Sequence, residues 1–171
     1  SYCDGTSDFR MLIDDAVAKN ISVVVAAGNA GSTTGISDPA CVKNSTAVGS
    51  TTKTDGFSGY NRNNITDLLA PGSSITSVNY QGGFNTQSGT SMAAPHVSGA
   101  IALLAQYKKL TDSMNLSPYA AFLALNTTGV NLTDNGTGGS GIQFARISVY
   151  KALLSLDTTP PNLTFVAPTL A

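Results

Sequence analysis

The sequence predicts an α/β fold in which helices cover a parallel β-sheet. Residues 21–27 are an almost unbroken β-branched run, and a strand that is apolar on both faces belongs inside such a sheet. Residues 93–110 form the most helix-like run, apolar nearly all round at first, which is typical of a buried helix. A hydrophobic content of 42% with 11% charged residues is that of a globular domain.

The other elements follow from periodicity, capping residues and turn residues. Apolar positions between Phe9 and Val17 have the spacing of one helix face, and Ser117-Pro118 is typical of a helix start. In chain order we expect a helix from a cap at Thr6 or Ser7 to about Lys19, the strand 21–27, a short strand near 45–49, a buried strand at 68–72, a hairpin of 75–78 and 84–87, the helix 93–110, a helix from 118 to about 127, a mobile surface loop at 128–141 and a last helix closing near Leu156.

Charge and composition exclude several classes of partner. The net charge of -1 gives no sign of binding to nucleic acid or anionic membranes, and no apolar run is long enough to span a membrane. The spacing of Cys3 and Cys41 fits neither a metal knuckle nor a redox pair, which leaves two separate apolar residues or one disulfide. Sequons of the N-x-[ST] type indicate an exported protein, secreted or at the cell surface, and occur at Asn20, Asn44, Asn64, Asn115, Asn126, Asn131, Asn135 and Asn162.

The stretch that carries chemistry is Gly-Thr-Ser-Met-Ala-Ala-Pro-His-Val-Ser-Gly at residues 89–99. Ser91 lies where the helix begins, and the unbonded N–H groups and positive dipole of a helix start stabilise negative charge on a reacting oxygen. Pro95 is expected in the first turn, where its missing N–H costs little. A Thr-Ser pair before a helix is by itself only an N-cap, so the interpretation depends on the whole pattern.

This stretch closely resembles the nucleophile motif of the subtilisin-like serine proteases, or subtilases, and matches it at every fixed position. The resemblance implies a subtilisin-like three-layer α/β fold with a parallel sheet, of which this chain would be the C-terminal half. It also implies a serine endopeptidase that cleaves polypeptide substrates through an acyl-enzyme on Ser91. Thr90, beside the nucleophile, is expected to support the geometry of the oxyanion hole.

Residues 26–31 read Ala-Ala-Gly-Asn-Ala-Gly and form a turn at the carboxyl end of a strand, where open α/β sheets place ligands. They resemble the subtilase segment whose asparagine amide completes the oxyanion hole. The resemblance implies that Asn29 faces the Ser91 N–H across the oxyanion. It also implies that Ala26, Ala27 and Gly28 border the S1 pocket.

A nucleophilic serine needs a base, and the sequence holds one histidine, His96. Five helical steps of about 100° from Ser91 place the two side chains on widely separated faces. In subtilases this histidine is structural, and the catalytic Asp and His lie upstream of the stretch seen here. We therefore expect the chain to be inactive without the N-terminal part of its catalytic domain. The strand 21–27 should then expose an edge that invites self-association.

The resemblance covers residues 1–156. Residues 157–171 contain paired prolines and predict a linker or the start of a downstream β-sandwich module. Some secreted subtilases carry cysteines in places comparable with Cys3 and Cys41, which favours a disulfide. No cofactor is expected to be required. Calcium often stabilises subtilases as a structural ion, although no acidic cluster in the sequence marks a metal site.

Two other functions compete with the protease. A secreted binding or structural protein could keep this scaffold without catalysis, and an upstream sequence lacking the Asp or His would support it. An α/β-hydrolase esterase needs G-x-S-x-G around its serine, whereas residues 89–93 lack the second glycine. The intact Ser91 and Asn29 favour the protease.

Overall fold

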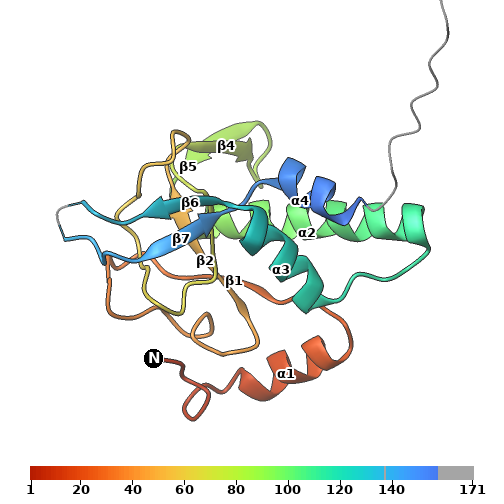
Figure 1. The fold of residues 1–171 in the computed structure, drawn as a ribbon. Helices are drawn as coiled ribbons and strands as arrows, with labels where there is room; N and C mark the ends of the chain where they lie inside the picture. The colour runs from red at the N-terminus through yellow and green to blue at the C-terminus, as the bar shows by residue number, and fades with distance from the viewer. Residues whose placement is uncertain (137, 158–171) are drawn as a thin grey trace, which may run out of the picture.

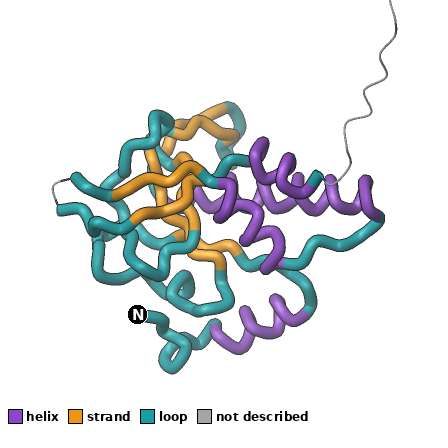
Figure 2. The backbone as a smooth tube through the Cα atoms, in the orientation of Figure 1, coloured by secondary structure: helices purple, strands orange, loops and turns teal. Residues whose placement is uncertain are grey.

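The computed structural model describes residues 1–136 and 138–157 (Figure 1). In Figure 2 the strands gather in one part of the molecule and most of the helices lie beside them. In chain order the elements are α1 (Arg10–Ala18), β1 (Val24–Ala26), β2 (Thr46–Thr51), β3 (Leu68–Pro71), β4 (Ile75–Val78), β5 (Phe84–Gln87), α2 (Thr90–Asp112), α3 (Pro118–Thr128), β6 (Val130–Thr133), β7 (Gln143–Arg146) and α4 (Val149–Leu156).

The larger sheet is mostly parallel and has the strand order β1-β2-β3-β7-β6. The strands β1, β2, β3 and β7 run parallel, and β6 pairs antiparallel with β7. The helix α2 packs against β1, β2 and β3, and it also contacts α3 and α4. The structure therefore confirms the predicted α/β class with a parallel sheet. The buried core between these elements consists of Val48, Leu68, Ala70, Ala93, Val97, Ala100, Leu104, Ala124, Leu125, Ala145, Ile147 and Ala152.

The hairpin and the later helices form where they were expected. The strands β4 and β5 pair as a separate two-stranded sheet, and Ser117 Oγ accepts the Ala120 N–H at the start of α3. The helix α2 is longer than expected at both ends, since it begins at Thr90 and ends at Asp112. Pro95 therefore lies inside the helix rather than in its first turn, and it cannot donate a helical hydrogen bond to the Ser91 carbonyl.

The helix α1 starts later than expected. Its cap position is Phe9 and not Thr6 or Ser7, whose N–H groups both bind the Cys3 carbonyl in a turn. Only Ile13 of the helix is buried, and Leu12 is 69% exposed. Periodicity predicted the helix correctly, but it could not predict how little of the apolar face is covered in this chain.

Two further expectations need correction. Part of the predicted surface loop 128–141 is the strand β6, whose backbone groups are satisfied by pairing with β7. The predicted strand 21–27 is reduced to β1, which is half-buried and lies at an edge of the described sheet. The predicted linker 157–171 lies, apart from Asp157, outside the described residues.

Cys3 and Cys41 form a disulfide, as the resemblance favoured. The Cys3 N–H also donates to the Cys41 carbonyl at 3.0 Å. The start of the described chain is thereby tied to the loop that follows β1. In the chain-entropy account, closing a loop of this length contributes about 4 kcal/mol.

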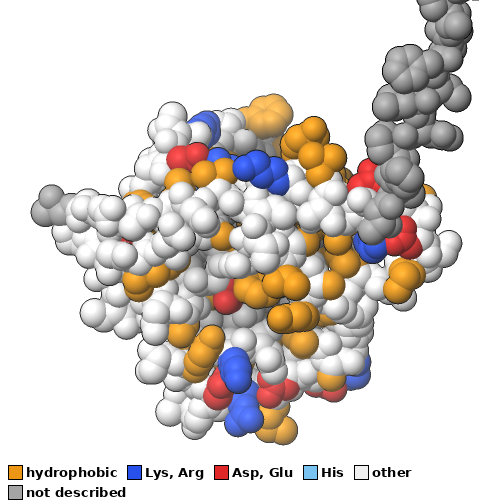
Figure 3. All heavy atoms as spheres, viewed as in Figure 1, with side chains coloured by type: hydrophobic (Ala, Val, Ile, Leu, Met, Phe, Trp, Pro, Cys, Tyr) orange, Lys and Arg blue, Asp and Glu red, His pale blue; other side chains and the backbone are white. Residues whose placement is uncertain are grey.

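The described helices include none that is both long and apolar enough to cross a membrane. On the face shown in Figure 3, neutral polar atoms dominate. Lys and Arg side chains form no continuous patch there, as the charged content of 11% leads one to expect.

A buried ion pair fixes the turn between β6 and β7. Arg62 Nε and Nη2 donate to the two carboxylate oxygens of Asp134 at 2.7 and 3.0 Å, and Asp134 is only 1% exposed. The Ser140 N–H donates to the same carboxylate at 2.7 Å. Burial by itself raises the pKa of Asp134, but these donors hold the pKa below its usual value. The carboxylate is therefore charged at neutral pH.

Replacing Asp134 should destabilise the fold strongly. Asp134→Ala leaves the Arg62 guanidinium buried without its partner, which should lower the free energy of unfolding by about 3–5 kcal/mol. Chemical denaturation measures this loss. Asp15→Ala is the matched control, because its pair with Lys19 is exposed and should contribute at most about 0.5 kcal/mol. Equal losses in the two variants would contradict the prediction.

Asp67 immediately precedes β3 and is held by β2. Its Oδ2 accepts the Ala47 N–H at 2.7 Å, and its own N–H donates to the Ala47 carbonyl at 3.0 Å. Burial raises the pKa of Asp67 to about 6, and the Ala47 hydrogen bond lowers it only in part. Because this pKa lies above the unfolded value of about 3.9, the charged carboxylate destabilises the fold above pH 6.

Stability should therefore depend on pH through Asp67. As the pH falls from about 7.5 to about 4.5, the folded state takes up the proton first, and the free energy of unfolding should rise by roughly 2 kcal/mol relative to that of Asp67→Asn. The variant keeps an oxygen acceptor for the Ala47 N–H. Both proteins share all other carboxylates, so the pH dependence that those groups cause cancels in the comparison. Denaturation curves of both proteins at each pH give the two free energies of unfolding. A difference that stays constant over this range would show that burial does not raise this pKa.

Candidate active site

The start of α2 is anchored on two sides. The hairpin β4–β5 leads into Ser88 and Gly89, and the Gly89 N–H donates to the Gly72 carbonyl, just after β3, at 2.8 Å. Ser88 Oγ accepts the Ser74 N–H at 2.8 Å. This holds the helix start against the end of the central strand. Further along, α2 is anchored in the core by buried Ala93, Val97, Ala100 and Leu104.

Ser91 is the second residue of α2 and is exposed. Its N–H lies in the first turn, where a helix offers no internal acceptor. The N–H groups on either side are bonded, that of Thr90 to Asn29 and that of Met92 to the Gly89 carbonyl. Among the described residues, no acceptor binds the Ser91 N–H. The helix thus presents one free N–H beside an exposed hydroxyl.

Asn29 lies beside this helix start, on the loop after β1. Its Oδ1 accepts the Thr90 N–H at 2.9 Å and the Thr90 hydroxyl at 3.0 Å. Its Nδ2 has no acceptor in the described part of the chain. A Cβ on Gly89, whose φ is 153°, would lie only 3.3 Å from this nitrogen. Glycine at position 89 therefore lets the Asn29 amide approach the helix start closely.

Thr90 joins the two segments. Its side chain is fully buried, and its Oγ1 donates to Asn29 Oδ1 while accepting the Gly28 N–H at 3.1 Å. A threonine hydroxyl has a single proton, and here that proton is engaged. Thr90 therefore acts on the site through Asn29 and Gly28, not by donating to a substrate.

Ala26, Ala27 and Gly28 lead from the end of β1 into the same loop. Ala27 is fully buried, and its carbonyl accepts the Ser37 N–H at 2.9 Å and Asn61 Nδ2 at 3.1 Å. Gly28 has a φ of 102°, and a Cβ there would collide with the side chains of Ser37 and Asn61. The N–H and carbonyl of Gly28 are both bonded within the protein, so the half-buried Ala26 side chain is the part of this segment left unengaged.

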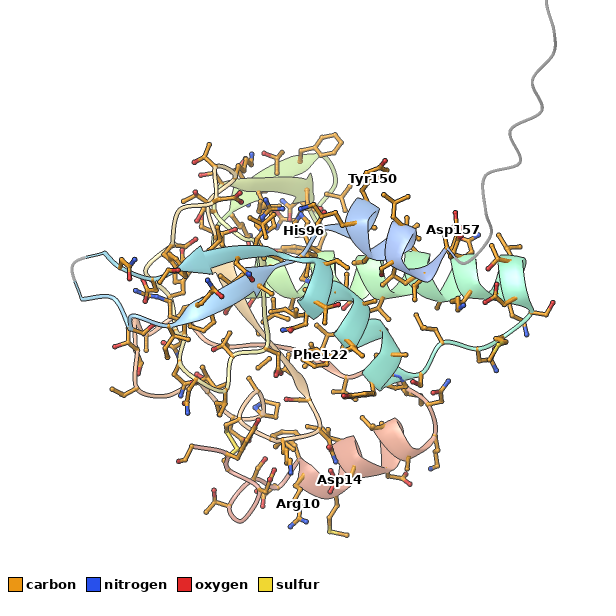
Figure 4. All side chains as sticks on the ribbon, in the orientation of Figure 1. Arg10, Asp14, His96, Phe122, Tyr150 and Asp157 are labelled. Atoms are coloured by element: carbon orange, nitrogen blue, oxygen red, sulfur yellow. A yellow bond between two sulfur atoms is a disulfide. The ribbon has the colours of Figure 1, made fainter. Side chains whose placement is uncertain are left out.

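His96 is exposed and lines the same groove as Ser91. Figure 4 shows it near the hairpin β4–β5. Its Nδ1 donates to the Met92 carbonyl, one turn back, at 2.8 Å. The expectation of widely separated faces is therefore met only in part, because both side chains border one groove. No hydrogen bond of the described residues joins His96 or another base to the Ser91 hydroxyl.

The groove runs between α2 and the hairpin and encloses about 470 Å³. It gives an extended ligand access to the Ser91 hydroxyl. Its walls are Ile75, Thr76, Ser77, Val78, Asn79, Asn85, Gln87, Ser91, Met92, Pro95 and His96.

Candidate metal sites among the described residues are close groups of His, Cys, Asp and Glu side chains. The one close group of three candidate ligands is Cys3, Asp38 and Cys41, and its two sulfurs are joined in the disulfide. Calcium takes oxygen ligands and usually several carboxylates. This group therefore does not support a calcium site.

Asn61 is a part of the site that the sequence did not predict. It is 4% exposed and binds the loop that carries Asn29. It lies in the irregular polar stretch 50–64, where no periodicity distinguishes one residue from another, and asparagine is common in loops. No local signal could have found it.

Several curated relatives are serine proteases. Alkaline serine exoprotease A of Vibrio alginolyticus is 39% identical over 123 residues, which cover 71% of this chain and 22% of the relative. The extracellular serine proteinase of a Thermus species is 48% identical over 98 residues, which cover 54% of this chain and 23% of the relative. The major intracellular serine protease of Bacillus subtilis is 37% identical over 123 residues, which cover 69% of this chain and 39% of the relative. The chain thus spans well under half of the length of each of these relatives.

A solved structure has the same fold. A cold-adapted subtilisin-like serine proteinase superposes with a TM-score of 0.66 at 35% identity, covering 79% of this chain and 48% of the other. The sequence pattern of the subtilase family matches residues 1–142, which is most of the chain and includes both Asn29 and Ser91. The chain therefore belongs to the subtilase family.

Proposed function

We propose that this chain supplies the nucleophile and the oxyanion hole of a serine endopeptidase that cleaves polypeptides. The observation that carries the proposal is a pair of unbonded donors, Asn29 Nδ2 and the Ser91 N–H, beside the exposed Ser91 hydroxyl at the start of a helix that buries one face. Donors held where negative charge develops usually make the largest single contribution to such catalysis. The subtilase family and the serine protease relatives support the same chemistry.

The reaction begins when a base removes the Ser91 hydroxyl proton and Oγ attacks the substrate carbonyl carbon. The carbonyl oxygen becomes an oxyanion held between Asn29 Nδ2 and the Ser91 N–H, with the positive end of the α2 dipole behind it. The protonated base then gives its proton to the departing amine, which leaves an acyl-enzyme on Ser91. Water, deprotonated by the same base, releases the acyl group. Thr90 keeps the Asn29 amide in place throughout.

The base is a histidine outside this sequence, oriented by an aspartate, as the subtilase resemblance implies. His96 is poorly placed for the task, because its Nδ1 is bonded to the Met92 carbonyl and no hydrogen bond joins it to Ser91. The complete enzyme is this chain together with the segment that supplies the base, in one polypeptide or in two that associate. The exposed edge of β1 offers a pairing site for that segment or for a second copy of the chain.

The proposed substrate is an extended polypeptide. Ala26, Ala27 and Gly28 form one border of the pocket for the side chain that precedes the cleaved bond, chiefly through Ala26. No cofactor takes part in this chemistry, and calcium would act only as a structural ion.

We propose an exported location, secreted or at the cell surface. The disulfide Cys3–Cys41 supports it, because such bonds persist in oxidising compartments. The sequons point the same way. One relative is named extracellular and another intracellular, so the proposal depends on the disulfide and the sequons rather than on the family.

Ser91→Ala should lower the turnover of a peptide anilide by the complete enzyme by about a millionfold, because the nucleophile is lost. Asn29→Ala should lower kcat by about 10²–10³-fold with little change in KM, because one oxyanion donor is lost. Residues 1–171 alone should show no more activity than the Ser91 variant.

The matched control is Ser98→Ala, which removes another exposed serine of α2 whose hydroxyl only bonds the Ala94 carbonyl. Its activity should equal that of the unmodified enzyme. A folded, unmodified complete enzyme that hydrolyses no peptide would contradict the proposal and favour a non-catalytic binding or structural protein.

A further inference from the structure

The loop of residues 28–37, which we call the oxyanion loop, carries Asn29 and is bound at several points by the buried residue Asn61. Where the loop leaves β1, the Asn61 N–H donates to the Gly28 carbonyl at 3.0 Å. Asn61 Nδ2 donates to the Ala27 carbonyl at 3.1 Å. Asn61 thus binds the two residues that immediately precede Asn29.

The same side chain also binds the loop further along. Asn61 Oδ1 accepts the Ser32 N–H at 3.0 Å, and its Nδ2 donates to Ser37 Oγ at 3.3 Å. The Ser37 N–H closes the loop onto the Ala27 carbonyl at 2.9 Å. A primary amide has two N–H donors, and both have acceptors here. Asn61 therefore binds both ends of the oxyanion loop, beside the direct hydrogen bond that joins Ser37 to Ala27.

The packing leaves little freedom for the peptide that leads into Asn29. Gly28 adopts a φ of 102°, and its Cα lies so close to Asn61 and Ser37 that a Cβ would collide with both. On its other side, Asn29 is held through Oδ1 by Thr90. The backbone of Asn29 is thus placed through Asn61, and its amide oxygen through Thr90.

We propose that Asn61 is a positioning residue that sets the placement of the Asn29 amide and, through it, the stabilisation of the oxyanion. The proposal rests on the proposed function above. Asn61 itself touches no reacting atom, since it is 4% exposed and its bonds go to the loop. Its effect is large because a misplacement of about 1 Å in a catalytic group lowers a rate by about a hundredfold.

Asn63 provides the matched control. It is 2% exposed and belongs to the same polar stretch, and its side chain binds the Thr34 carbonyl and the Ile65 N–H, each at 3.2 Å. It therefore contacts the oxyanion loop at Thr34 but not at the residues that flank Asn29. Asn63→Ala removes two buried side-chain hydrogen bonds where Asn61→Ala removes three, and it does not disturb the Ala27–Asn29 segment directly.

The test is a double-mutant cycle in the complete enzyme with a peptide anilide, using Asn61→Ala, Asn29→Ala and the two together. Asn61→Ala should lower kcat by about 10–100-fold with little change in KM. In the Asn29→Ala background the same substitution should lower kcat by less than about threefold, because the donor that it positions is already gone. Asn63→Ala should shift Tm by a similar amount but keep kcat within about threefold of the unmodified enzyme.

Two results would overturn the proposal while the proposed function stands: an unchanged kcat in Asn61→Ala, or losses that multiply fully in the double variant. If Asn61→Ala fails to fold, Asn61→Asp carries the same cycle, because it keeps the acceptor for the Ser32 N–H and loses both amide donors. An unmodified complete enzyme without activity would reject the proposed function itself, and the role of Asn61 with it.

Discussion

The site depends on the hydrogen bond from the Thr90 hydroxyl to Asn29 Oδ1. An asparagine amide can be turned either way, and only its nitrogen can donate to an oxyanion. Because Oδ1 is occupied by both the N–H and the hydroxyl of Thr90, Nδ2 remains as the group without a protein acceptor among the described residues. The donor is thus oriented before any substrate arrives, and a preorganised donor needs no rearrangement during the reaction.

Burial makes this bond effective. Thr90 is fully buried, and a hydrogen bond away from water is stronger than one in solvent. Thr90 stays buried because Val97, Ala100 and Leu104 of the same helix pack into the core. Gly89 allows the chain to turn into the helix beside Asn29. The length of apolar helix behind Ser91 therefore serves the chemistry, since it prevents the first turn from moving relative to β1.

Local signals predicted much of this arrangement, and contacts between distant segments decided the rest. The motif at 89–99 and the apolar periodicity behind it gave the start of α2, and the turn at 79–83 gave the hairpin. Asn61 and Ala27 are 34 positions apart, and Arg62 and Asp134 are 72 apart, so no sequence window contains either pair. The strand β6 was missed for another reason: it pairs with the nearby strand β7, and this pairing overrides a loop-like composition.

The proposed oxyanion donors and the groups that orient them lie within this chain, between Ala27 and Ser91, whereas the proposed base does not. The electrostatic part of the site is therefore assembled independently of the part that moves the proton. The open edge of β1 ends at Ala26, three residues before Asn29, and the loop between them is fixed by Asn61 and Thr90. A segment that pairs with this edge would lie close to the proposed oxyanion hole. Strand pairing at β1 would position a base and the preformed donors in a single step.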